Sequence, residues 1–363
     1  MKFSWKTLTL AVASSVTAGG ALAQSSVTVQ GLLDMDVGSV KYSGDTGSKA
    51  SVNSGGLTTS WIGFKGAEDL GNGMKAEFAL TSFLQVDTGA SGRFDGDTLF
   101  SRDANLALSG AFGRVSMGRD LAPSFLPTVI FNPFGDSFSY SPLVLHTWVP
   151  NGNYAARSWV NMLAGDSGWS NEVIYTTPNF NGLSANFHYQ FGEKAGDTGT
   201  KNWGMNALYF NGPLALSMYY HQVQVGNPTP GAIIDATATP VNYASVNNQK
   251  TWFVGGSYDL SAVKLYATYS NAKDDSSLSL DMNDKTYSLG AKVPAAGGDI
   301  LLAFADTKRT GSLVGADLKR DTFTVGYDYN LSKRTDVYAL VMSDKLNTAD
   351  RANSVAAGIR HKF

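Results

Sequence analysis

The sequence predicts an all-β protein, a closed 16-stranded antiparallel transmembrane β-barrel. Three observations lead to this fold class. Apolar and polar side chains alternate with a period of two, as at Val355, Ala357 and Ile359, which indicates strands with one apolar and one polar face. Tight turns alternate with longer polar segments, which is typical of membrane barrels. The 39 Gly, 19 Phe, 16 Tyr and 7 Trp suit many short strands joined by turns.

Composition excludes several other classes of protein. The 363 residues include 28 Lys plus Arg and 30 Asp plus Glu, and a net charge of −2 gives no reason to expect nucleic-acid binding. The chain has no cysteine, which excludes disulfides and thiol chemistry. Beyond the N-terminus, no stretch approaches the roughly 18 to 20 consecutive apolar residues of a membrane-spanning helix.

The N-terminus has the features of a secretory signal. Lys2 and Lys6 precede an apolar run over 8–21, and Ala21, Leu22 and Ala23 form a small-x-small cleavage pattern. We therefore expect residues 1–23 to be removed after export, and residues 24–363 to form the barrel.

Counting the alternating runs between turns predicts sixteen strands, an even number that leaves both termini of the chain on the periplasmic side. The runs are 27–41, 57–69, 74–87, 98–109, 113–119, 171–178, 183–193, 202–211, 214–225, 250–259, 262–273, 284–294, 299–309, 319–330, 334–345 and 353–363.

The alternation is also compatible with a soluble β-sandwich. A membrane barrel is favoured because aromatic residues cluster near the predicted strand ends, as at Tyr327 and Tyr329, where interfacial girdles lie. A sheet in lipid must close, because an edge would leave backbone groups without hydrogen bonds.

Seven stretches spread along the chain resemble the general trimeric porins of β-proteobacteria. They are 24–29 (QSSVTV), 63–73 (GFKGAEDLGNG), 108–113 (LSGAFG), 115–119 (VSMGR), 175–182 (YTTPNFNG), 329–335 (YNLSKRT) and 358–363 (GIRHKF). The resemblance implies a sixteen-stranded barrel, a homotrimer and a third loop folded inward to narrow the pore. It also implies that the barrel-assembly machinery recognises the last strand through Phe363.

The segment 120–170 stands where that third loop belongs. Its length favours a functional loop. It is rich in Phe, Tyr and Trp but contains only three acids, Asp120, Asp136 and Asp166, and one arginine, Arg157. We expect it to fold into the barrel, which would bury its rings and constrict the pore.

Pore selectivity is set by the diameter and the charges of the narrowest point. The resemblance implies wall arginines that face loop carboxylates. Arg102 keeps one such arginine, Trp61 stands where the family usually has another, and Gly168, next to Trp169, replaces a third. Our hypothesis is a constriction with weaker anion selectivity that favours neutral or aromatic solutes. The alternative is that Trp61 and Trp169 belong to girdles or loop packing.

Four further residues are constriction candidates: Arg119 and Arg157 as cations, and Asp120 and Asp136 as opposing carboxylates. Arg102 presents a conflict, because strict alternation places it on the outward face with Leu106. We expect a β-bulge that turns Arg102 inward; the alternative is contact with a trimer neighbour.

The predicted function is passive diffusion of small hydrophilic solutes and ions across the outer membrane of a Gram-negative bacterium. A substrate-specific channel is the alternative, and a barrel enzyme or an adhesin anchor is a remote one. The four histidines (His146, His188, His221 and His361) are scattered and match no catalytic or metal motif. We expect no cofactor. The expected partners are two further copies of the chain, outer-membrane lipid, lipopolysaccharide, the assembly machinery and the permeating solutes.

Overall fold

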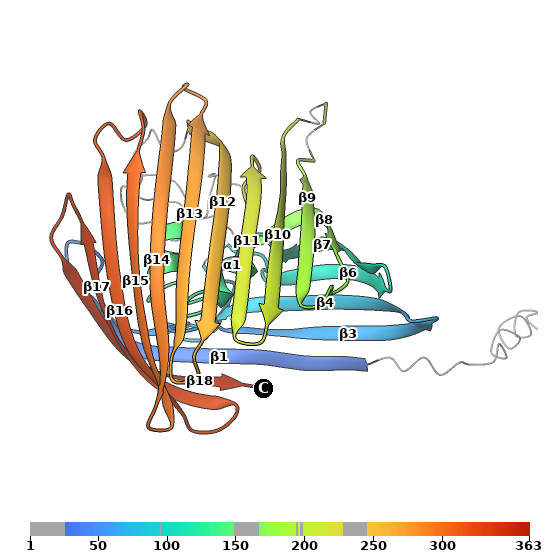
Figure 1. Ribbon diagram of the computed structural model, residues 1–363, viewed down its shortest axis with the longest axis horizontal. Coiled ribbons are helices and arrows are strands. Elements are labelled where there is room, and N and C mark those ends of the chain that lie inside the picture. Colours follow the sequence, from blue (N-terminus) through green and yellow to red (C-terminus); the bar gives the residue numbers. More distant parts are fainter. Residues whose placement is uncertain (1–25, 95, 149–166, 194, 197–198, 228–244) are drawn as a thin grey trace, which may run out of the picture.

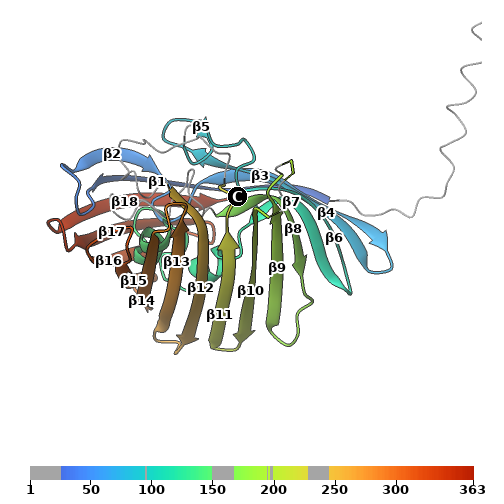
Figure 2. The same cartoon turned by 90° about the horizontal axis from the view of Figure 1, so that it is seen from above.

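The computed structural model describes residues 26–94, 96–148, 167–193, 195–196, 199–227 and 245–363. It confirms the predicted antiparallel barrel (Figures 1 and 2). Its strands are β1 (Ser26–Val40), β2 (Lys49–Ser54), β3 (Trp61–Gly71), β4 (Met74–Gln85), β5 (Ala90–Ser91), β6 (Asp103–Gly110), β7 (Gly113–Leu121), β8 (Gly168–Thr176), β9 (Leu183–Phe191), β10 (Lys201–Asn211), β11 (Leu214–Val223), β12 (Val246–Asp259), β13 (Lys264–Ser276), β14 (Asp281–Ala295), β15 (Gly298–Thr310), β16 (Leu318–Asn330), β17 (Thr335–Leu346) and β18 (Ala352–Lys362).

These eighteen strands occupy the sixteen predicted positions of the wall. The strands β2 and β3 pair with successive halves of β1 and together fill one position. The two-residue strand β5 pairs only with the end of β4, in a hairpin above the wall. The sequence pattern found every wall strand but missed the interruption between β2 and β3.

The barrel closes where the first strand meets the last. Residues of β1 pair with β18 from Leu32, opposite Lys362, to Ser39, opposite Val355. Gly31 and Phe363 then exchange two backbone hydrogen bonds of 3.0 Å. A side chain on Gly31 would lie 2.5 Å from the Phe363 ring, so only glycine leaves room for the terminal aromatic residue at this seam.

The two faces of the wall differ in polarity as the alternation predicts. On β14, Tyr287 and Leu289 are exposed on the outer face, whereas Thr286 and Ser288 are buried on the inner face. An apolar outer face suits lipid, and a polar inner face suits a water-filled lumen. In the part of the chain that the structure describes, no helix is long and apolar enough to cross a membrane.

The segment between β7 and β8 contains two short helices, α1 (Phe125–Ile130) and α2 (Pro142–Thr147). Its described part contacts the inner face of the wall. Asn206 donates a hydrogen bond of 2.9 Å to the Pro123 carbonyl, and Ser137 donates one of 2.6 Å to the carbonyl of Gly56. Within the expected loop 120–170, residues 149–166 lie outside the described residues.

Candidate pore constriction

Three residues form a compact cluster on the inner wall at the loop end of β3 and β6. The Arg102 guanidinium forms a 2.6 Å ion pair with Asp103. The same guanidinium lies 4.3 Å above the centre of the Trp61 ring, within the range of a cation–π interaction. The positive charge of Arg102 is therefore balanced by a neighbouring carboxylate and lies over the indole ring.

The backbone is irregular at Arg102, where β6 begins. Pairing between β4 and β6 is regular from Asp103, opposite Thr81, to Ser109. The N–H of Arg102 also donates a 3.2 Å hydrogen bond to the carbonyl of Thr81. Arg102 and Asp103 thus both face one residue of β4, which is the arrangement of a β-bulge. The side chain of Arg102 turns toward the inward-facing Asp103.

Asp136 faces this cluster from the loop. Its carboxylate is hydrogen-bonded to the Thr58 side chain and interacts electrostatically with Arg102 and Arg360. Burial raises the pKa of Asp136 above its ordinary value, although the two arginines act in the opposite direction. The structure therefore brings together the loop carboxylate and the wall arginine that sequence reasoning paired.

Arg360 joins this group as a cation that sequence reasoning left aside. It donates hydrogen bonds of 3.1 Å to Asp336 and Asp328 and one of 2.9 Å to the Thr58 hydroxyl. Its place on the inner face follows from the alternation along β18, but its closeness to Asp136 depends on how the loop folds.

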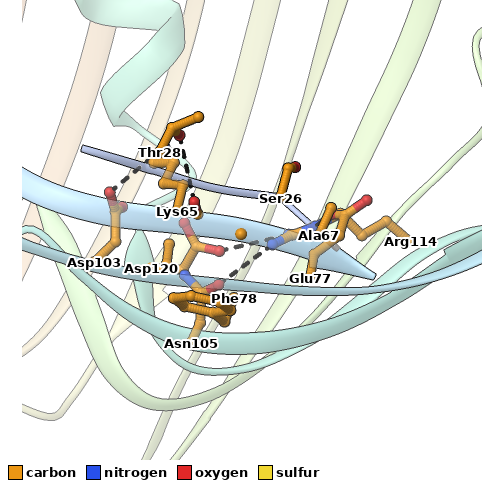
Figure 3. A pocket seen from close by; sticks show the side chains of 12 residues that line it. Ser26, Thr28, Lys65, Ala67, Glu77, Phe78, Asp103, Asn105, Arg114 and Asp120 are labelled. Carbon is orange, nitrogen blue, oxygen red and sulfur yellow. Dashed lines mark hydrogen bonds and ion pairs between the residues drawn. The ribbon is translucent and has the colours of Figure 1, made fainter. Parts of the chain in front are cut away.

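A cavity of about 360 Å³ lies below the cluster on the inner wall of β1, β3, β4, β6 and β7 (Figure 3). Lys65 lies 4.0 Å from Asp103, and Arg114 lies 3.0 Å from Glu77 and 3.6 Å from Asp120. Cations and carboxylates thus alternate along this wall. Asp120 belongs to this cavity and pairs with Arg114.

Arg119 has a different environment from the one expected of a pore arginine. The pairing of β7 with β8 shifts between Gly118 and Asp120. The buried guanidinium then donates hydrogen bonds to the carbonyls of Ser101 (2.7 Å) and Gly168 (3.2 Å). A side chain added at Gly168 would begin 3.5 Å from the Arg119 guanidinium carbon. The nearer obstacle is the backbone carbonyl oxygen of Asp120, 2.9 Å from the position of that side chain, so glycine at 168 permits the close pairing of β7 with β8.

Trp169 is buried, with 1% of its surface exposed. It packs among apolar residues that include Ala122, Val223 and Met282. The centroid of its ring lies 6.0 Å from that of the His221 ring. This environment corresponds to the loop-packing alternative for Trp169, whereas Trp61 belongs to the cluster with Arg102. The remaining candidate, Arg157, lies outside the described residues.

The loop is held to the opposite wall by buried polar contacts. Both ring nitrogens of His146, in α2, lie 2.8 Å from the hydroxyls of Thr307 and Thr322. Arg320 donates a 3.1 Å hydrogen bond to the Leu145 carbonyl and forms a fully buried 2.9 Å ion pair with Asp344. Burial lowers the pKa of His146 well below its ordinary value, so the ring is neutral at pH 7.

Comparisons with known proteins find relatives with the same fold over nearly the whole chain. A family model described as Gram-negative porin matches residues 7–349. The chain is 31% identical to outer membrane porin protein 32 of Delftia acidovorans, over 96% of this chain and 92% of that protein. The structure of an anion-selective porin from Comamonas acidovorans covers 94% of this chain and 100% of its own, at 27% identity and a TM-score of 0.73. OmpT of Vibrio cholerae in a trimer form shares the fold, at 16% identity and a TM-score of 0.67, covering 93% and 99% of the two chains.

We predict that Arg320→Met destabilises the barrel by about 3–5 kcal/mol, because it leaves the Asp344 carboxylate buried without its partner. Thermal unfolding in detergent measures the effect. Arg351→Met is the matched control, since Arg351 forms an exposed pair with Asp321 and should change stability by less than about 1 kcal/mol. Equal losses in the two variants would contradict the prediction.

Proposed function

The chain belongs to the Gram-negative porin family, and on this premise we propose how its channel selects solutes. It is a passive outer-membrane channel for small solutes and ions and not an enzyme. We propose that the constriction is only weakly anion-selective and admits neutral or aromatic solutes more readily than an arginine-lined pore.

The observation that carries this proposal is the pairing of Arg102. An arginine favours anions when its charge faces the lumen uncompensated. Arg102 instead forms a 2.6 Å ion pair with Asp103, lies over the Trp61 ring and interacts electrostatically with Asp136. Trp61 adds apolar surface at a position where a second arginine would add charge.

The constriction itself is proposed to be the segment 120–170. Support comes from the contacts of its described part with inner-face residues on separate parts of the wall, such as Asn206 on β10 and Thr307 on β15. We also propose that residues 1–23 form the removed signal and that Phe363 is the assembly signal. A substrate-specific channel remains the alternative, and block of the conductance by aromatic solutes would favour it.

A homotrimer is supported by the distribution of aromatic residues on the outer face. On the described strands, alternation places all outward Tyr and Trp on β8–β14 and β16, for example Trp203, Trp252 and Tyr287. The wall formed by β17, β18, β1, β3, β4, β6 and β7 presents mainly aliphatic residues such as Leu106 and Val355. Tyr and Trp mark a lipid interface, so the aliphatic wall is the proposed subunit contact.

We predict that Trp61→Arg increases anion selectivity, because the new guanidinium faces the lumen where Asp103 already pairs with Arg102. Reversal potentials of the purified channel in a KCl gradient measure the change. Trp61→Phe keeps an aromatic ring without charge and should leave the ion selectivity unaltered. A wild-type channel with strong anion selectivity would contradict the proposal.

The selectivity should also depend on pH through Asp136. Because its pKa is raised, its carboxylate becomes neutral at a higher pH than an ordinary aspartate does. The constriction then gains net positive charge, so anion selectivity should rise as the pH falls. Asp136→Asn should show the acid-form selectivity at every pH. A titration of the reversal potential that is identical in the variant and the wild type would exclude Asp136.

The subunit contact is tested with two alanines that both face outward. Ala357→Trp on β18 places a large ring in the aliphatic wall and should convert trimers into monomers. Ala267→Trp on β13 places the same ring among lipid-facing residues and should leave the trimer intact. Size-exclusion chromatography with light scattering distinguishes the two results, and a trimeric Ala357→Trp variant would place the contact elsewhere.

A further inference from the structure

Three glycines on the inner face of the wall lie against residues of the loop between β7 and β8. They are Gly204 on β10, Gly290 on β14 and Gly326 on β16, and we call them the glycine sockets. A methyl group on Gly204 would begin 2.8 Å from Cγ of Pro123, and one on Gly290 would begin 2.6 Å from Cδ of Pro133. Carbon atoms in nonbonded contact lie about 3.5–4.0 Å apart. Only glycine therefore lets the loop come this close to the wall.

Gly290 is the socket in which the loop itself fills the space. Both ring atoms of Pro133 would lie nearer to the added methyl group, at 2.6 and 3.1 Å, than the nearest wall atom, the Leu302 carbonyl oxygen at 3.3 Å. At Gly326 the methyl group would begin 3.2 Å from the Phe134 ring but 2.7 Å from the Leu340 side chain. A substitution at Gly290 would therefore act mainly on the loop.

The turn between α1 and α2, which fills two of the sockets, is held together by the buried side chain of Asn132. Its amide donates hydrogen bonds to the carbonyls of Thr128 (2.9 Å) and Gly135 (3.0 Å). Its oxygen accepts hydrogen bonds from the N–H of Phe134 (2.9 Å) and the hydroxyl of Ser141 (3.0 Å). A turn fixed in this way moves as a unit, so displacement at one socket displaces the whole turn.

The inner wall near the sockets is apolar, unlike the polar inner face elsewhere on β14. Phe131 of the loop belongs to a buried cluster with Leu208 of β10. Phe134 belongs to another cluster with Leu301 of β15 and Leu340 of β17. These wall residues would face the water of the lumen without the loop, so their burial stabilises the docked position of the loop.

We propose that the glycine sockets set the width of the channel. They let the loop lie about one methyl group deeper in the wall than any other residue would allow, and the width of the narrowest point limits which solutes pass. A side chain in a socket points into the lumen and pushes the loop toward the bore. The sockets are positioning residues, since they act through the loop. This inference rests on the proposed function, because it takes that loop as the constriction.

The test substitutes Gly290 in the full chain and measures single-channel conductance in planar bilayers. Gly290→Ala requires Pro133 to retreat by about 1 Å, and Gly290→Val requires more, so the conductance should fall stepwise, by roughly twofold for the valine variant. Swelling of proteoliposomes in sugars of increasing size should slow most for the largest sugar. The matched controls are Gly256→Ala and Gly256→Val on β12. Gly256 faces outward, and its methyl group would begin 3.3 Å from the flexible end of Leu216, so both controls should conduct normally.

A compensating change separates a displaced loop from a damaged barrel. Pro133→Ala removes the two ring atoms that a methyl group at position 290 would meet. The double variant Gly290→Ala, Pro133→Ala should therefore regain most of the conductance that Gly290→Ala loses. The proposal is overturned by unchanged or increased conductance in the Gly290 variants, by an equal loss in the Gly256 controls, or by no recovery in the double variant. If Gly290→Val does not fold, the alanine variants carry the test.

Reversal potentials of the same preparations keep this test separate from the proposed function. Strong anion selectivity of the wild type would refute the proposed selectivity and leave the role of the sockets intact. Identical conductance in all variants would refute the role of the sockets and leave the channel function intact.

Discussion

The structure depends on one constraint, that no backbone hydrogen-bonding group of the wall can be left unpaired in lipid. Closure of β1 on β18 removes the sheet edges. The interruption between β2 and β3 shows the same constraint on a small scale. There the carboxylate of Asp34 accepts hydrogen bonds from the backbone N–H groups of Leu57 (2.9 Å) and Thr58 (2.7 Å). The Asp34 side chain thus supplies the hydrogen bonds that a neighbouring strand would otherwise provide.

The polar lumen imposes a second requirement, because inward-facing charges beneath the loop are shielded from water and need partners. Arg320 pairs with Asp344, and Arg309 pairs with Asp284 at 2.8 Å. The loop between β7 and β8 is anchored on this paired wall. The same pairing occurs at the proposed constriction, where Arg102 forms an ion pair with Asp103. In our proposal, the ion selectivity therefore depends on how the charges are paired as well as on the number of arginines.

The fold was largely predictable because the alternation of apolar and polar residues is local. It identified the wall strands, their even number and the shared face of residues such as Val355 and Ile359, which lies outward. Strict alternation alone could not place Arg102, because Arg102 and Asp103 both face Thr81 and this irregularity depends on the pairing with β4. It also gave no sign that Arg119 would be buried against backbone carbonyls, since that depends on a shift in pairing between β7 and β8.

By itself, the sequence determined a closed barrel with an apolar outer face, because the alternation of apolar and polar residues is complete within each strand of about ten residues. It also determined which residue types are available to the pore, including a tryptophan at 61 and a glycine at 168. Only the tertiary structure decided which charges meet. Asp136 comes close to Arg102 through the folding of the loop. Lys285 lies opposite Lys308 because of the strand register. Both depend on interactions between distant parts of the chain.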